Sequence, residues 1–251
     1  MNRGTIGLLP RTPTLEDESY LAFMESLRNH NIRAMFPNIM GFADAADADS
    51  RPYTRLWKRL MRSQQQQTWQ KIQDSYAQRR AHYEAELDAA ERSRPDRLHY
   101  DRNFEVPKYA TLDIHLQPGG YHTDFTADDV AAGAVYDKGI NLYMGGALGE
   151  ENNLTGDTLL AYVREKHPSL QLHSILDLGC AIGNSTVVWA RAFPKARVHG
   201  IDVGAPVLRY AHARAQALGV PVDFSQQNAE RTDFADGSFD LVLSHIVLHE
   251  T

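Results

Sequence analysis

The hydrophobic positions of this chain follow a helical spacing in its first half and a strand–helix alternation in its second half. Leu21, Met24 and Leu27 recur every three residues within a predicted helix over residues 14–33. Acidic residues near the start of this segment suit the positive end of a helix dipole. Residues 42–50 are rich in alanine and aspartate and predict a loop.

The longest predicted helix runs from Pro52 to about Ser93, because this stretch has no glycine and no further proline. Apolar residues spaced by three, four or seven positions line one side of it: Leu56, Leu60, Trp69, Ile72, Tyr76, Tyr83 and Leu87. Such a stripe predicts packing against another helix of the same chain. The alternatives are the seam of a homodimer formed through the N-terminal helices, or a lid helix over a binding site.

Pro95 ends this predicted helix, and a less regular stretch follows. Residues 109–116 alternate enough between apolar and polar side chains to predict a strand, and residues 127–136 predict a helix. Gly145 and Gly146, followed by polar residues, indicate a boundary or hinge.

A regular alternation of strands and helices begins after this boundary. The predicted elements are helix 158–167, strand 174–178, helix 185–193, strand 197–202, helix 206–218, strand 221–226 and strand 239–247. Pro206 suits the first turn of its helix and Gly219 the position just past its end. Alternation of this kind predicts an α/β fold with parallel strands and right-handed crossovers.

The first strand of this alternation runs into a glycine-containing turn. Asp177 stands at the carboxyl end of the strand, where open α/β sheets bind their ligands. Gly179 and Gly183 allow the backbone to approach a bound molecule closely, and the following helix start offers unpaired N–H groups. Asp202 ends the next strand, about 20 residues later, where a ribose-binding carboxylate is expected. The alternative for Asp202 is a helix N-cap.

The turn resembles the first motif of class I S-adenosylmethionine-dependent methyltransferases. The resemblance is carried by Asp177-Leu-Gly179-Cys-Ala-Ile-Gly183, although Ala181 departs from the commonest form of the motif. A second block, Asn228-Ala229-Glu230 followed by residues 234–245, is similar to methyltransferases of the ubiquinone and menaquinone C-methylating type. The resemblance covers residues 141–251 and implies a Rossmann-like sheet, S-adenosyl-L-methionine as cofactor and methyl transfer to a carbon or oxygen of a small molecule.

The resemblance also implies which residues form the cofactor site. They are Asp177, Gly179, Ala181, Gly183, Asp202, Val203, Asn228, Ala229 and Ser244. Asp177 and the Gly179 backbone are expected near the amino-acid part of the cofactor, and Asp202 at its ribose hydroxyls. Val203 is expected to pack on the adenine. The Asn228 side-chain oxygen is expected to accept a bond from the adenine amino group, next to the Ala229 N–H.

Two histidines are the candidate catalytic residues. His245 is expected to face the transferred methyl group beside Ser244 and to act as a base, since an imidazole accepts a proton near pH 7. The alternative is a positioning or core histidine. His249 is close in sequence, but His-x-x-x-His-Glu is not the His-Glu-x-x-His metal motif, so we expect no metal here. Cys180 is expected to pack within the loop.

The charge and composition of the chain bear on which kinds of binding partner are expected. A net charge of −6 gives no reason to expect nucleic acid or an anionic membrane. No apolar run approaches the length of a membrane span, and a single cysteine cannot form an internal disulfide. We therefore expect a cytoplasmic location by default and a small-molecule substrate.

We divide the chain into a mainly helical extension or lid, residues 1–140, and the N-terminal half of an S-adenosylmethionine-binding domain, residues 141–251. A complete sheet of this family has seven strands, and about four are predicted here, so we expect a fragment of a longer polypeptide. The alternative is that N-terminal elements such as residues 109–116 complete the sheet. Two other functions stay open: an NAD(P)-dependent oxidoreductase, disfavoured by the glycine spacing, and a non-catalytic methyltransferase-like scaffold.

Overall fold

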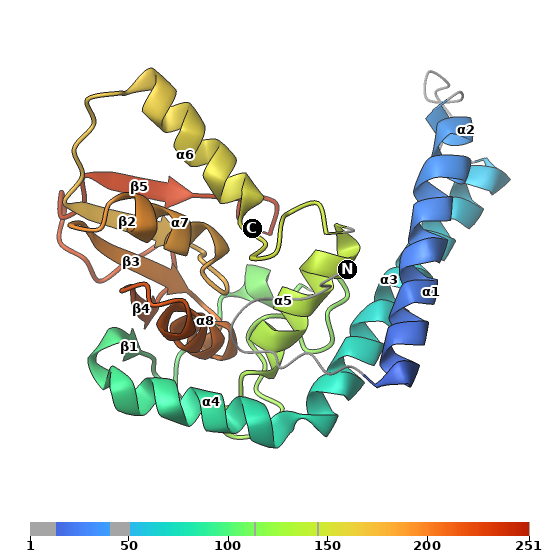
Figure 1. The fold of residues 1–251 in the computed structure, drawn as a ribbon, viewed down its shortest axis with the longest axis horizontal. Coiled ribbons are helices and arrows are strands. Elements are labelled where there is room, and N and C mark those ends of the chain that lie inside the picture. The colour runs from blue at the N-terminus through green and yellow to red at the C-terminus, as the bar shows by residue number, and fades with distance from the viewer. Residues whose placement is uncertain (1–13, 41–50, 113, 145, 251) are drawn as a thin grey trace.

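The fold joins a parallel sheet at one end of the molecule to a pair of long helices that project from the other end (Figure 1). The computed structural model describes residues 14–40, 51–112, 114–144 and 146–250. The predicted loop over residues 42–50 lies outside the described residues. None of the described helices is both long enough and apolar enough to cross a bilayer.

The sheet has five parallel strands in the order β1-β4-β3-β2-β5. Their bounds are Leu98–His99 for β1, Ser174–Leu178 for β2, Arg197–Asp202 for β3, Asp223–Gln226 for β4 and Leu241–Ser244 for β5. The predicted α/β class and parallel pairing are confirmed. The predicted strands 221–226 and 239–247 are shorter in the structure.

Three helices belong to this alternation: α6 at Leu154–Lys166, α7 at Asn184–Ala192 and α8 at Ala205–Ala217. The chain moves from β2 through α7 to β3, and then through α8 to β4, in one direction across the sheet. Right-handed crossovers in the same direction place α7 and α8 on the same face. Trp189 and Phe224 are fully buried between these layers.

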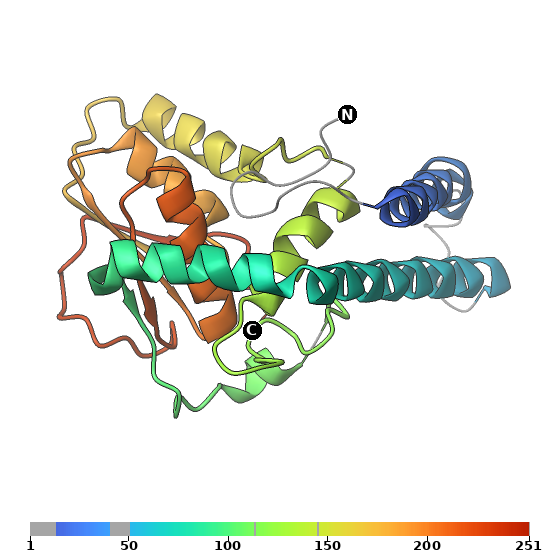
Figure 2. The ribbon, with the colours of Figure 1, turned by 60° about the horizontal axis from the view of Figure 1, so that its bottom comes forward.

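The N-terminal region is helical, as predicted. Its elements are α1 at Leu15–His30, a π-helical turn at Asn31–Met35, α2 at Phe36–Met40, α3 at Pro52–Gln78, α4 at Arg80–Ser93, 3₁₀ turns at Pro95–Arg97 and Lys108–Thr111, and α5 at Ala131–Tyr143. Helices α1 and α3 lie side by side, whereas α4 runs along the sheet domain (Figures 1 and 2).

The single helix predicted over residues 52–93 is wrong, because the chain turns at Arg79. Arg79 has φ −115° and ψ 12°, and its N–H donates to the Tyr76 carbonyl at 2.9 Å. Its guanidinium donates to buried Asp17 of α1 at 3.0 Å. The turn lets α3 pack on α1 and α5 while α4 packs on α8.

The strand predicted over residues 109–116 is also wrong. Lys108–Thr111 forms a 3₁₀ turn instead, and Leu112 is exposed. The carbonyls of Ile114 and His115 accept hydrogen bonds from side chains of α3 rather than from a neighbouring strand. A different N-terminal element, β1, extends the sheet beside β4.

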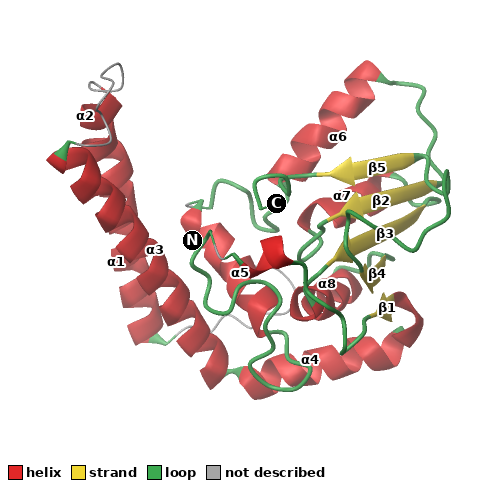
Figure 3. Ribbon diagram, turned by 180° about the vertical axis from the view of Figure 1, so that it is seen from behind, coloured by secondary structure: helices red, strands yellow, loops and turns green. Residues whose placement is uncertain are grey.

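Helix α5 connects the N-terminal helices to the sheet domain, and it lies between them when the molecule is seen from behind (Figure 3). It begins and ends later than the predicted helix 127–136. Gly139 of α5 lies against Trp69 of α3, and Gly133 lies against Tyr210 of α8. The boundary drawn between residues 140 and 141 therefore falls inside a helix that contacts both parts.

Candidate cofactor site at the carboxyl end of the sheet

The turn between β2 and α7 has the backbone conformation that its glycines predict. Gly179 has φ 66° and Gly183 has φ 75°, both in the left-handed region that glycine enters without a Cβ penalty. Ala181, the residue that departs from the family motif, also has a positive φ of 46°. The Gly183 N–H donates to the Cys180 carbonyl at 2.8 Å and closes the turn before α7 begins.

Asp202 at the end of β3 faces this turn. Its two carboxylate oxygens accept hydrogen bonds from the Ala181 N–H and the Gly204 N–H, each at 2.9 Å. Burial raises the pKa of Asp202, and these backbone donors partly offset the rise. A carboxylate has about four lone-pair sites, so the two donors orient Asp202 and leave acceptor capacity for a diol.

Asp177 is buried on the other side of the turn, 2% exposed. Its carboxylate accepts a 2.7 Å hydrogen bond from the Thr186 hydroxyl of α7. Burial raises the pKa of Asp177 to about 7, and the charge of Asp202 adds to the rise. Asp177 therefore ties β2 to α7 beneath the glycine turn.

The segment after β4 contacts the N-terminal region. The Asn228 side-chain oxygen, expected at the adenine amino group, accepts hydrogen bonds from the Tyr109 hydroxyl and the Glu230 N–H, both at 2.9 Å. Ala229 is exposed next to it, and Val203 is half-buried after β3. This arrangement brings Tyr109, from a segment predicted to be a strand, to the expected adenine edge.

The end of β5 lies beside the glycine turn. Ser244 pairs in register with Leu178, so His245 follows at the level of Gly179. Burial lowers the pKa of His245, which keeps its imidazole neutral at pH 7. A Cβ on Gly179 would lie 2.7 Å from a methyl group of Val247. The chain after β5 thus crosses directly over the turn.

His249 lies further along this crossing segment. Its Nε2 atom is 3.2 Å from the Glu250 carboxylate and 3.1 Å from Nε2 of His115. The structure therefore separates the two candidate catalytic histidines. His245 lies next to the glycine turn, whereas His249 belongs to a cluster with two other ionisable side chains.

Aromatic residues of the N-terminal region complete the surroundings of Asp202. Tyr121 packs edge-on against Tyr136 at 5.4 Å between ring centroids, and its carbonyl lies against Gly204. Burial raises the pKa of Tyr136 to about 12, and the charges of Glu250 and Asp202 contribute. Tyr109 and Tyr121 could not be predicted as site residues, because no sequence spacing relates them to the strands β3 and β4, more than 70 residues away.

Cys180 packs inside the glycine turn, as expected. It is buried, and its Sγ atom would lie 2.8 Å from a Cβ added to Gly200 of β3. Burial raises the pKa of the Cys180 thiol well above its usual range. A protonated, enclosed thiol is a packing group rather than a nucleophile.

The glycine turn, the acid at the end of a strand and the parallel sheet agree with the result of comparing the sequence with models of protein families. Residues 175–251 match the model of the methyltransferase domain. Over these residues the chain is similar to a methyltransferase domain. The recognition made from the two motifs is thereby confirmed.

Curated relatives of this methyltransferase domain include three named enzymes. The chain is 47% identical over 47 residues to trans-aconitate 2-methyltransferase of Afipia carboxidovorans, covering 19% of the chain and 18% of that protein. It is 37% identical over 68 residues to demethylmenaquinone methyltransferase of Thermus thermophilus, covering 27% and 31%. It is 38% identical over 84 residues to ubiquinone biosynthesis O-methyltransferase of Nitrosococcus oceani, covering 33% and 34%.

The chain thus spans no more than about a third of the length of these curated relatives. A solved S-adenosylmethionine-dependent methyltransferase from Clostridium acetobutylicum aligns over 43% of each chain, at 20% identity and a TM-score of 0.36. At this identity and TM-score, we draw no functional conclusion from the similarity of the two structures.

Proposed function

We propose that this chain binds S-adenosyl-L-methionine at the carboxyl end of the sheet and takes part in methyl transfer to a carbon or oxygen atom of a small molecule. The observation that carries the proposal is Asp202, which two backbone N–H groups orient at the glycine turn while acceptor capacity remains. A carboxylate with free lone pairs beside a positive-φ turn fits the vicinal hydroxyls of a ribose.

When the cofactor is bound, its sulfonium makes the attached methyl group electrophilic. The residues of this chain would then align the acceptor, exclude water and accept a proton. His245 is the proposed base, because its imidazole is neutral at pH 7 and follows Ser244 beside Gly179. Tyr136 and Tyr121, which pack near Asp202, would help to enclose the site.

The three named relatives act on small molecules according to their names, which supports a small-molecule acceptor. A cytoplasmic location and the absence of a nucleic-acid partner are part of the same proposal and rest on composition. Homodimer formation through the N-terminal helices stays a prediction. The residue range 1–140 is proposed to act as a cover over the site, because Tyr109 and Tyr121 of that range reach its edge.

A calorimetric titration of the full chain with S-adenosylhomocysteine tests the cofactor assignment, with NAD as the control ligand. We expect saturable binding of S-adenosylhomocysteine and none of NAD. Asp202→Ala should weaken this binding by about 1–3 kcal/mol, through loss of charge-assisted hydrogen bonds. Tight binding of NAD alone would instead support the oxidoreductase alternative.

His245→Ala is the matched comparison in the same titration. Because His245 is proposed to act on the acceptor, its removal should lower methyl transfer while leaving affinity for S-adenosylhomocysteine within about twofold of the unmodified chain. Thermal melts of both variants establish that they are folded. Equal affinity of Asp202→Ala and the unmodified chain would remove Asp202 from the site. No binding by the folded, unmodified chain would favour the scaffold alternative.

A further inference from the structure

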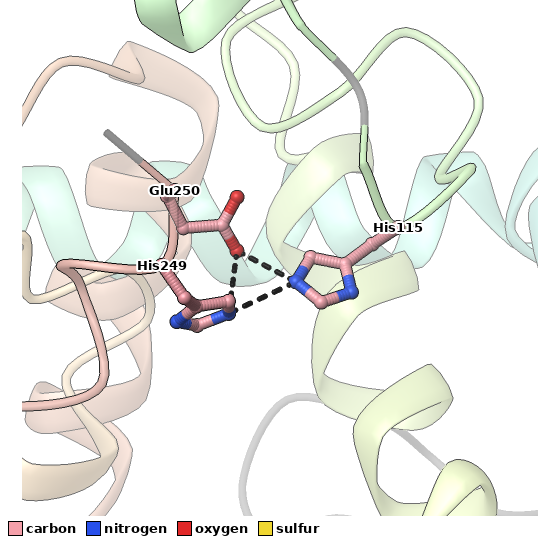
Figure 4. Close-up of side chains that lie close together, drawn as sticks. All are labelled: His115, His249 and Glu250. Atoms are coloured by element: carbon pink, nitrogen blue, oxygen red, sulfur yellow. Dashed lines mark hydrogen bonds and ion pairs between the residues drawn. The ribbon is translucent and has the colours of Figure 1, made fainter. Parts of the chain in front are cut away.

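Three ionisable side chains from two segments that are distant in sequence meet in the structure (Figure 4). His115 comes from the segment that precedes α5, and His249 and Glu250 come from the segment that follows β5. His115 Nε2 lies 2.8 Å from Glu250 Oε1 and 3.1 Å from His249 Nε2, and the third side of the triangle, His249 Nε2 to Glu250 Oε1, is 3.2 Å.

With an ionised carboxylate, protons alone do not satisfy all three sides of this triangle. The Nε2 atom of a histidine is either a donor or an acceptor, and an ionised carboxylate oxygen only accepts. If both rings donate to Glu250, two N–H groups face each other. If one ring accepts from the other, its lone pair faces the carboxylate oxygen. A cation bound to all three atoms resolves the conflict, because each atom then contributes a lone pair.

The lengths of the triangle fit a shared metal ion. Zinc and similar ions bind imidazole nitrogen and carboxylate oxygen at about 2.0–2.2 Å. Three such ligands at right angles would lie about 3 Å apart, and at tetrahedral angles about 3.4 Å apart. The three observed separations of 2.8, 3.1 and 3.2 Å place the atoms on one face of a coordination sphere. The opposite positions remain open to other ligands.

The backbone under His115 is fixed by helix α3. Its carbonyl accepts hydrogen bonds from Gln65 Nε2 at 2.8 Å and from Trp69 Nε1 at 2.9 Å. The Glu250 N–H donates to the Val247 carbonyl at 2.8 Å, and Val247 packs on Gly179. Both halves of the cluster are therefore held by neighbouring structure, which reduces the cost of organising ligands around an ion.

We propose that His115, His249 and Glu250 bind one divalent first-row transition-metal ion, such as Zn²⁺, with coordination positions left open. Two imidazoles and one carboxylate form a ligand set typical of such ions, whereas Mg²⁺ prefers an all-oxygen set. The proposal goes beyond the proposed function and does not depend on it, because it concerns metal binding by the chain itself.

The location gives the proposed metal a connection to the cofactor site. Val247 packs on Gly179 of the turn, and the Glu250 N–H donates to the Val247 carbonyl, so the cluster follows directly after the segment that crosses the turn. An ion there would offset the negative charge of Glu250. Its open positions would accept an oxygen or nitrogen donor close to the glycine turn.

The first measurement is a titration of the full chain, freed of metal with a chelator, with Zn²⁺ by calorimetry. We expect one Zn²⁺ per chain, unaffected by an excess of Mg²⁺. Co²⁺ bound to the same three side chains should give visible absorption bands that depend on its ligand field. Adding Zn²⁺ should abolish these bands by displacing the Co²⁺ from the site. Absence of stoichiometric Zn²⁺ binding by the folded chain would overturn the proposal.

Three variants identify the ligands. His115→Ala and His249→Ala should each weaken Zn²⁺ binding at least tenfold. Glu250→Gln keeps the shape of the side chain and should do the same, so it decides the question if a histidine variant fails to fold. His173→Ala is the matched control. His173 also lies near a carboxylate, that of Asp240 at 3.8 Å, but this pair belongs to no group of three possible metal ligands among the described residues. Wild-type affinity in folded His115→Ala or Glu250→Gln would contradict the assignment.

Discussion

The carboxylate of Asp177 makes the stability of this protein dependent on pH. Burial raises the pKa of Asp177 to about 7, while the Thr186 hydrogen bond lowers it and the charge of Asp202 raises it. An aspartate in the unfolded chain titrates near pH 4. Between about pH 4 and pH 7 the folded protein therefore holds a proton that the unfolded chain has lost, so this group's contribution to stability falls as pH rises through that window.

We expect Asp177→Asn to remove this contribution. The amide oxygen can still accept from Thr186, and no charge is buried at high pH. The free energy of unfolding, measured in urea at several pH values, should fall less steeply from pH 4.5 to pH 7 in the variant. The difference in slope is at most about 1.4 kcal/mol per pH unit.

Asp240→Asn supplies the control for this pH series. The backbone N–H groups of His173 and Ser174 hold the pKa of Asp240 below its usual range, so its contribution is present above about pH 4 and is lost only as pH falls further. Its variant should keep the wild-type slope between pH 4.5 and pH 7. Parallel curves for Asp177→Asn and the unmodified chain would show that Asp177 is ionised in the folded state.

At the scale of elements, the close contact between α3 and α5 depends on a glycine. A Cβ placed on Gly139 would lie 1.5 Å from the Trp69 ring, which is itself buried. Gly139→Ala should therefore destabilise the protein by about 1–3 kcal/mol through overpacking, although alanine favours the helix by about 1 kcal/mol. Chemical unfolding of the variant measures the net effect.

A double-mutant cycle with Trp69→Leu separates the contact from helix propensity. If the added methyl group collides with the indole, Gly139→Ala should cost less in the Trp69→Leu background than in the unmodified chain. The coupling is expected to be about 1 kcal/mol or more. Equal costs in both backgrounds would show that the helices adjust their spacing and that the glycine is not required by packing.

Elements with local determinants were predictable from the sequence. The strands at residues 174–178 and 197–202 have the predicted bounds, because buried parallel strands read as apolar runs between turn residues. The turn at Arg79 was not predictable, since its partner Asp17 lies 62 residues away. The cluster of His115, His249 and Glu250 was not predictable for the same reason. His249 and Glu250 are adjacent, but His115 joins them across 134 residues.

At the scale of the whole molecule, the N-terminal helices and the sheet domain share buried surface. One hydrophobic core contains Trp69, Tyr83 and Val135 together with Ile182 and Val207 of the sheet domain. Buried polar contacts also cross between the two parts, since the Tyr210 hydroxyl of α8 donates to Asp137 of α5 at 2.6 Å. Separating the parts would expose apolar surface and break buried hydrogen bonds.

We therefore expect the described parts of the chain to unfold in one cooperative transition. Trp69 and Trp189 are both buried, the first in α3 and the second in α7, so each reports on one part. In a Trp57→Phe background, Trp189→Phe leaves Trp69 as the reporter and Trp69→Phe leaves Trp189. Within each variant, the fluorescence and far-ultraviolet circular dichroism curves in urea should share one midpoint.

Comparing two signals within one variant avoids the change in stability that each substitution brings. A Trp69 transition at lower urea than the loss of circular dichroism would show that the helical extension detaches while the sheet domain stays folded. That result would support treating residues 1–140 as a separate lid. Coincident curves would mean instead that the segment between α4 and α5, which contributes Tyr109, Tyr121 and His115 to the edge of the cofactor site, is held there by the same core that stabilises the sheet.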